Sequence, residues 1–416
     1  MNVCLLNDSF PPLLDGVSNT VLNYARVLGE RGEKAAVATP AYPGVTDDYP
    51  FEVVRYASLD TTKSLGYRTG FPFSAAAMQR LEAFSPTLIH SHCPMASTFL
   101  ARELRCLTGA PIVFTYHTKF DVDIRRVIKG KLLQESAIRE IIRNIEACDE
   151  VWAVNRGAGE NLKSLGFRGD YLVMENGVDM TLDPVPVEEL RRLEETYRIK
   201  ACAPVFLFVG RMLWYKGLST ILDSLAELKR AGEPFTMLFV GDGEDLAAVR
   251  ERAERQGLSG DCVFPGAIRD RALLKALYTR ADLFLLPSVF DNNPLVVKEA
   301  AACRTASVLI RGSSSAENVT DGENGFLTED SVPSFTRALL AVCRRPELAK
   351  EAGERASRTL YLSWEDAIDR AVARYREILR DRRGGDRTEA TVSDKMIEAI
   401  GRFYRLTNRP KTDDLP

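Results

Sequence analysis

Two acidic residues in the stretch FLLPSVFDNNPLVVKEAAA (residues 284–302) have a spacing that could serve a phosphate-bearing ligand. Asp291 and Glu299 stand eight residues apart, after an expected buried strand at 283–286 and around a helix that we expect to begin near Pro294. Proline suits the first helical turn, and a helix N-terminus offers unpaired N–H groups and a positive field that favour a phosphate. Glu299 could reach ribose hydroxyls while Asp291 holds a second part of the ligand. This layout favours a sugar nucleotide, and the alternative is an ordinary strand–turn–helix step with solvated acids.

Two cations follow another expected strand, at 204–209. Arg211 and Lys216 belong to the sequence GRMLWYKG, residues 210–217. An arginine offers a two-pronged fork and a lysine a point charge, so together they could clamp a diphosphate. The alternative is two solvated surface cations. The glycine turn VGDG at 240–243 is a weak signal, because it lacks the full dinucleotide fingerprint.

The first half of the chain carries a glycine at the start of a helix and all three histidines. Asp15 and Gly16 open the first expected helix, where a glycine lets the backbone approach a ligand; a tight turn is the alternative. His90 and His92 share one face of a strand, and His117 ends the neighbouring strand. Metal binding is one interpretation of the histidine pair, but no acid or cysteine completes a ligand set there. His117 is either a core residue or a cleft residue.

Strands and helices alternate along the chain, which predicts βαβ units with parallel sheets. We expect one loop region, from residue 40 to about 69. The pattern restarts after a polar helix near 187–197, so we expect two doubly wound α/β domains with a cleft between them. Ligands bind such sheets at the carboxyl ends of the strands, where every residue named above is expected. The boundaries that we predict are 1–180 for the first domain, 181–363 for the second, a helix at about 364–382, and a polar linker with a tail helix at 383–416.

Composition excludes several classes of protein. The 416 residues are 45% hydrophobic and carry 55 basic against 58 acidic side chains, a balance that argues against nucleic acid as the main partner. No apolar run reaches the length of a membrane span, and MNVCLLNDSF reads as a first strand and not as a signal peptide. The eight cysteines form no Cys-x-x-Cys pair, so we expect reduced packing residues in a cytoplasmic protein without structural zinc.

One segment indicates contact with a membrane surface or an anionic acceptor. Residues 121–133 combine apolar residues with four cations: Arg125, Arg126, Lys129 and Lys131. A basic amphipathic stretch can lie at a membrane interface. The alternative is a solvated helix over the core.

With these motifs in hand, residues 1 to about 380 resemble the retaining glycosyltransferases of family 4, which have the GT-B architecture of two Rossmann-like domains. The resemblance rests on motifs in the family's order: DGVSNTV at 15–21, FTYHT at 114–118, ENGVD at 175–179, VGRMLWYKG at 209–217, PSVFDNNPLVVKEA at 287–300 and DGENGFL at 321–327. In the family the last helix crosses back onto the first domain, and the chain from Trp364 onward is similar to that element. The chain departs from the family's pattern at three positions. Asp15 occupies the place of the first of two glycines, Asp291 occupies the place of a glutamate, and Pro294 occupies a place where the family often has glycine.

The resemblance implies transfer of a hexose from a UDP- or GDP-sugar with retention of configuration, and without a divalent metal or a cofactor. Arg211, Lys216 and backbone amides near Leu295 would stabilise the leaving diphosphate. Glu299 would hold the ribose, and Asp291 the sugar hydroxyls. The implied catalytic residues are Arg211, Lys216, His117 and Asp291, and the implied donor-binding residues are Gly16, Arg211, Lys216, Asp291, Asn292, Leu295, Val296 and Glu299.

The acceptor stays open between a lipid, a polysaccharide and a small metabolite. A nucleotide-sugar-binding protein without turnover is the alternative function, and the presence of Arg211, Lys216 and Glu299 argues against it. A pyridine-nucleotide oxidoreductase is disfavoured because no fingerprint with a downstream ribose-binding acid appears.

Overall fold

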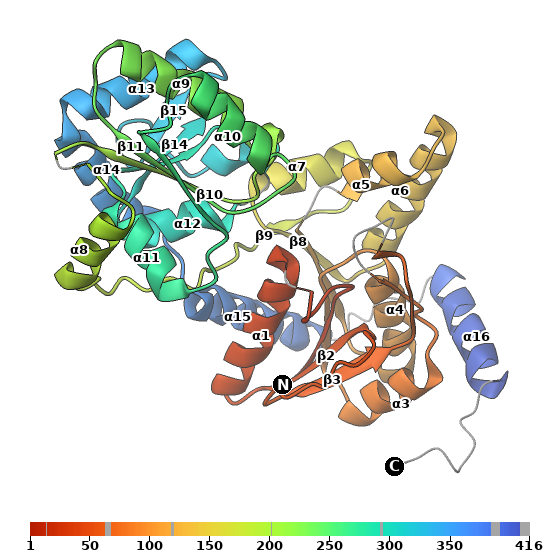
Figure 1. Cartoon of the computed structure of the whole chain (residues 1–416). Coiled ribbons are helices and arrows are strands. Elements are labelled where there is room, and N and C mark those ends of the chain that lie inside the picture. The colour runs from red at the N-terminus through yellow and green to blue at the C-terminus, as the bar shows by residue number, and fades with distance from the viewer. Residues whose placement is uncertain are drawn as a thin grey trace. The chain divides into compact units, whose positions relative to one another are not determined.

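The computed structural model describes residues 1–13, 15–62, 68–117, 120–200, 202–291, 294–383 and 392–407 (Figure 1). These residues form two compact units. The first comprises residues 1–176 and 364–416, and the second residues 177–363. The boundary therefore lies a few residues before the predicted one at 180, and the tail helix predicted as a separate part within 383–416 belongs to the first unit.

The first unit is built on a seven-stranded parallel sheet with the strand order β3-β2-β1-β6-β7-β8-β9. The central strands are buried along their length, as expected for a parallel sheet covered on both faces. Its elements up to the crossover are β1 Asn2–Leu6, α1 Gly16–Glu30, β2 Lys34–Pro40, β3 Glu52–Tyr56, β4 Ser58–Leu59, β5 Thr69–Gly70, α3 Ala75–Phe84, β6 Leu88–Ser91, α4 Ala96–Thr108, β7 Ile112–Tyr116, α5 Phe120–Val127, α6 Lys131–Glu146, β8 Glu150–Ala153, α7 Arg156–Ser164 and β9 Leu172–Val173.

The second unit repeats this plan around a six-stranded parallel sheet with the order β12-β11-β10-β13-β14-β15. A single apolar core surrounds its central strands. Its elements are α8 Val187–Thr196, β10 Val205–Val209, the 3-10 turn η1 Trp214–Lys216, α9 Leu218–Arg230, β11 Thr236–Val240, α10 Leu246–Arg255, β12 Cys262–Gly266, α11 Arg271–Arg280, β13 Leu283–Leu286, α12 Leu295–Ala302, β14 Ala306–Ile310, the 3-10 turn η2 Ser314–Ala316, β15 Phe326–Thr328, α13 Val332–Arg344 and α14 Pro346–Thr359.

The chain returns to the first unit through α15 Trp364–Arg383, which packs on α1. Trp364 and Tyr375 on this helix are buried, and Arg31 makes a bidentate contact with Asp369 at 2.8 Å. The tail helix α16 Val392–Thr407 lies beside α4, as Figure 1 shows. A Cβ at Gly401 would lie 2.0 Å from Glu103 on α4, so the two helices approach closely. The return of the C-terminal helices to the first domain is confirmed.

One part of the expected order was wrong. We expected a loop from residue 40 to about 69, but this region contains β3, which pairs in parallel with β2 at the edge of the sheet. Glu52 and Arg55 interrupt the apolar pattern of this strand, so its pairing depends on β2 and not on local sequence. Helix α3, which follows, was also not expected.

Candidate functional site

Lys216 and Asp291 meet at the topological switch point of the second sheet. Lys216 follows β10 and Asp291 follows β13, and these strands are neighbours from which the strand order runs in opposite directions. Lys216 Nζ donates a hydrogen bond to Asp291 Oδ1 within an ion pair. The side chains are 16% and 15% exposed, and Asp291 Oδ2 is buried without a hydrogen-bond partner among the residues described. The structure thus joins two predicted site residues that are 75 positions apart.

Close backbone packing places Lys216 there. Gly217 ends η1 with a φ of 81°, and a Cβ at this position would lie 2.3 Å from the carbonyl oxygen of Pro287 at the end of β13. Only glycine lets the two strand ends approach so closely. Gly241 has the same function at the end of β11, where a Cβ would lie 1.9 Å from the carbonyl oxygen of Gly210. The glycine turn that was a weak sequence signal is therefore a packing requirement of the site.

Glu299 is held at both carboxylate oxygens. Arg271 Nη2 donates to Oε1 at 2.9 Å, and the Tyr278 hydroxyl donates to Oε2 at 3.1 Å. Burial, and then the charge of Glu299, raise the pKa of Tyr278 well above its usual value, so the phenol remains a donor. Arg271 also donates to the carbonyl of Asp179 at 3.3 Å. Glu299 is only 8% exposed, yet each of its oxygens keeps a further lone pair that could accept a ribose hydroxyl.

Sequence reasoning missed Arg271 and Tyr278. They lie 28 and 21 residues before Glu299, and only the packing of α11 against α12 brings the three together. One available signal is that Arg271 opens the helix that follows a strand end, on the carboxyl side of the parallel sheet where ligands bind.

Three other predicted donor residues, Arg211, Leu295 and Val296, lie within five residues of Lys216 or Asp291 along the chain. Arg211 is exposed, and its Nη2 donates to the Tyr215 hydroxyl at 3.3 Å. Leu295 and Val296 form the first turn of α12, where no described side chain caps the backbone amides. Backbone amides at a helix N-terminus that no side chain caps can bind an anion. Asn292 lies outside the described residues.

In the first unit, Asp15 caps the N-terminus of α1, where we expected the backbone to approach a ligand. Its Oδ1 accepts hydrogen bonds from the amides of Val17 at 2.9 Å and Ser18 at 2.7 Å, and Ser18 Oγ accepts from the Asp15 amide at 2.8 Å. This reciprocal cap stabilises α1. A Cβ on Gly16 would meet nothing within 4 Å, so packing does not require glycine there. A donor contact at Gly16 remains a prediction.

The three histidines form two hydrogen-bonded groups at the ends of β6 and β7. His90 contacts Tyr375 through Nδ1 at 2.5 Å and Thr115 through Nε2 at 2.7 Å. Because both of its ring nitrogens are engaged, His90 has none left for a metal. His92 Nδ1 lies 2.9 Å from His117 Nε2. Among the described parts of the chain, no group of three potential metal ligands comes together.

A buried acid that the sequence did not single out lies under these strand ends. Asp8 accepts hydrogen bonds from the Ser97 amide at 2.9 Å, the Cys93 thiol at 3.1 Å and the Tyr56 hydroxyl at 3.2 Å, and also from Ser97 Oγ. Burial raises the pKa of Asp8, although these hydrogen bonds oppose the shift. The network ties β1, β3 and the start of α4 together and thereby supports the loops above them.

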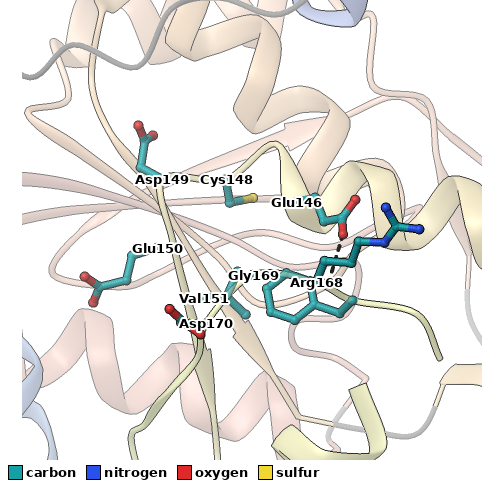
Figure 2. Close-up of a pocket in the computed structure, with 9 residues that line it drawn as sticks. Glu146, Cys148, Asp149, Glu150, Val151, Arg168, Gly169 and Asp170 are labelled. Atoms are coloured by element: carbon teal, nitrogen blue, oxygen red, sulfur yellow. Dashed lines mark hydrogen bonds between the residues drawn. The ribbon is translucent and has the colours of Figure 1, made fainter. Parts of the chain in front are cut away.

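A hollow of about 530 Å³ lies at the opposite edge of the first sheet (Figure 2). It is lined by the start of β8 and the turn before β9, and Glu146 Oε1 accepts from the Arg168 amide at 3.0 Å across it. Asp149 and Glu150 line it too, but Arg382 and Arg374 hold these acids in ion pairs. Its acids therefore have structural partners, and its position at the amino ends of the strands separates it from the predicted site.

The turn between α5 and α6 exposes apolar and basic side chains together. Leu132 and Leu133 are 84% and 65% exposed, and Arg125, Lys129 and Lys131 beside them are also exposed. The side chain of Arg126 lies outside the described residues. In the described ranges, no helix is both long and apolar enough to cross a bilayer.

Comparison with known proteins gives the family. Residues 14–182 match the model of Glycosyltransferase Family 4, and residues 192–359 match that of Glycosyl transferases group 1. Alpha-monoglucosyldiacylglycerol synthase of Streptococcus pneumoniae is 21% identical over 82% of this chain and 79% of its own, and the GDP-mannose-dependent alpha-mannosyltransferase of Corynebacterium glutamicum is 23% identical over 91% and 89%. The solved structure of Anabaena HepE in complex with UDP aligns with a TM-score of 0.72 at 17% identity, over 91% of this chain and all of that one.

Together the two family models span both domains, and the solved structure of HepE has the same fold. The chain belongs to the glycosyltransferases of family 4 and group 1, and it is an enzyme with the GT-B fold.

Proposed function

We propose that this enzyme transfers a hexose from a UDP- or GDP-sugar, with retention of configuration and without a divalent metal. The Lys216–Asp291 pair at the switch point carries the proposal, because it places a cation and a carboxylate side by side just before the N-terminus of α12, the helix that carries the fixed Glu299. A diphosphate needs the cation and the helix amides, a ribose needs Glu299, and a hexose needs an acceptor of hydroxyl hydrogen bonds.

Donor binding must change the Lys216–Asp291 contact. In the free enzyme the lysine neutralises the aspartate, and an arriving diphosphate competes for the same ammonium group. Lys216 can then stabilise the charge that grows on the leaving phosphate, with Arg211 as a second cation. Asp291, released in part from Lys216, can accept hydrogen bonds from the sugar through Oδ2, which is buried and without a partner in the part of the chain described. Two side-chain cations would thus supply the charge that a divalent metal supplies elsewhere.

The names of the relatives support the donor class and the stereochemistry. One uses GDP-mannose, and the solved structure of another holds UDP. Two of the names describe α-linked products. Sugars in GDP-mannose and UDP-glucose are α-linked, so an α-linked product corresponds to retention. A diacylglycerol appears in the name of one relative, which supports a lipid among the candidate acceptors.

The test is incubation with radiolabelled UDP- and GDP-sugars, with release of free nucleoside diphosphate as the readout. A thermal-shift panel of UDP-, GDP- and ADP-sugars first selects the donor. Release of diphosphate that depends on Lys216 and on an added acceptor supports the proposal, and NMR of the product gives the anomeric configuration. Tight donor binding without release under any acceptor contradicts it.

A further inference from the structure

The side chain of His92 contacts His117, which the resemblance to the family implies as a catalytic residue. His92 Nδ1 and His117 Nε2 lie 2.9 Å apart, and the planes of the two rings differ by only 25°. A hydrogen bond between two imidazole nitrogens needs one donor and one acceptor. The bond therefore has two states, one donated by His92 and one donated by His117.

The two states give His117 opposite chemical properties. If His92 donates, a neutral His117 carries its own proton on Nδ1 and offers that N–H to a ligand. If His117 donates through Nε2, its Nδ1 is bare and acts as an acceptor or a base. Both rings are neutral at physiological pH, because burial lowers the pKa of His117 to about 3 and, together with the neighbouring histidines, lowers that of His92 well below its usual value.

The second nitrogen of His92 distinguishes between the two states. Nε2 of His92 is buried and has no hydrogen-bond partner among the residues described. In the first state this atom is a bare acceptor, and in the second it is a buried N–H without an acceptor. Among buried backbone groups, an orphaned N–H is the rarer of the two. By the same reasoning the surroundings of His92 favour donation from His92.

The ring of His92 is held in this orientation by its neighbours. The centroid of the His90 ring lies 3.9 Å from that of His92, and Tyr24 contacts His92 edge-on with centroids 5.4 Å apart. His90 is itself locked by Tyr375 at Nδ1 and Thr115 at Nε2. A flip of the His92 ring would have to displace this packed group.

We propose that His92 is a positioning residue that fixes His117 as its Nδ1–H tautomer, so that His117 meets a ligand as a hydrogen-bond donor and not as a base. A role of His117 in turnover rests on the proposed function, whereas the tautomer rests on the His92–His117 geometry alone. The ligand group that fits this donor is a sugar hydroxyl or ring oxygen with a free lone pair.

Nitrogen NMR of protein labelled only at histidine tests the tautomer. The chain has three histidines, so the spectrum is simple and each ring can be assigned from a single variant. We expect wild-type His117 to be protonated at Nδ1 and bare at Nε2. Protonation at Nε2 would overturn the proposal, whatever the activity of the enzyme.

Variants separate positioning from packing. His92→Phe keeps a ring but removes the donor, and His92→Gln moves the amide to the far end of the side chain; in both, His117 should lose its tautomer preference. His92→Asn places an amide where Nδ1 stands and should keep it. Tyr24→Phe is the matched control, because it keeps the ring that packs edge-on against His92 and leaves both nitrogens of the His92–His117 bond in place. Melting temperatures show which variants fold, and an unchanged His117 spectrum in a folded His92→Phe or His92→Gln protein contradicts the proposal.

Kinetics test the consequence for the reaction. We expect His92→Phe to lower kcat about tenfold, the equivalent of one ordinary hydrogen bond, with a smaller change in KM and recovery in His92→Asn. A shifted tautomer with unchanged kcat would refute the role of His117 in turnover. Absence of turnover in the wild type with every donor would refute the proposed function and leave the tautomer assignment standing.

Discussion

Removal of Lys216 should lower both the turnover and the stability of the enzyme, for two different reasons. In Lys216→Ala the leaving diphosphate loses a cation where its charge grows, and one such donor typically contributes on the order of 100-fold to kcat. The same change leaves Asp291 without its partner. Breaking a fully buried pair costs about 3–5 kcal/mol and breaking an exposed pair at most about 1 kcal/mol. With exposures of 16% and 15%, we expect a loss of about 2–4 kcal/mol in the unfolding free energy of the second unit.

A double variant separates the two effects. Lys216→Ala with Asp291→Asn removes the unpaired charge, so stability should recover while kcat stays low; this non-additivity is the sign of direct coupling. Lys229→Ala is the matched control, because Lys229 pairs with Asp261 at 2.8 Å in the same unit and away from the switch point. It should lower stability slightly and leave kcat unchanged.

The assay is steady-state release of nucleoside diphosphate at saturating acceptor, beside denaturant unfolding of each variant. If Lys216→Ala keeps its kcat and only KM rises, the lysine binds the ground state and transition state equally, and the assigned role in catalysis is wrong. If the double variant stays as unstable as the single one, the ion pair does not account for the lost stability.

Four further outcomes are expected. Asp291→Asn should weaken discrimination between two epimeric donors without weakening the affinity for free diphosphate, which no longer competes with a charged aspartate for Lys216. Equal losses for both donors together with weaker diphosphate binding would assign Asp291 to the phosphate loop. Tyr278→Phe should weaken binding of the ribonucleotide several-fold but not of its 2′,3′-dideoxy analogue, because it frees one oxygen of Glu299 from its fixed position; equal losses for both nucleotides would refute this. Turnover should persist in EDTA, and rescue by manganese of an EDTA-inactivated enzyme would contradict metal independence. Binding to anionic vesicles, measured by flotation, should fall when Leu132 and Leu133 are changed to serine, with neutral vesicles as the control; no binding in the wild type removes the membrane contact.

Local patterns determined the classes of element and the general position of the site. Alternating apolar strands and helices predicted two parallel-sheet domains, and the strand at 283–286 lies where the structure has β13. Arg211, Lys216 and Asp291 follow expected strands in the sequence. Because parallel sheets bind ligands at the carboxyl ends of their strands, these residues were predicted to line the site. These inferences need only nearest neighbours along the chain, because strand length, helix start and glycine turns are encoded within a few residues.

Only the tertiary structure decided which of these residues touch. The Lys216–Asp291 pair depends on the strand order that puts β10 beside β13. The hydrogen bonds to Glu299 depend on the packing of α11 against α12. Edge strand β3 was missed because its pairing with β2 outweighs a weak local pattern. The link from His92 to His117 likewise crosses two strands whose register no local signal reports. A sequence specifies short-range geometry directly, but contacts between distant segments arise from the packing of whole elements, where a shift of one residue changes every partner.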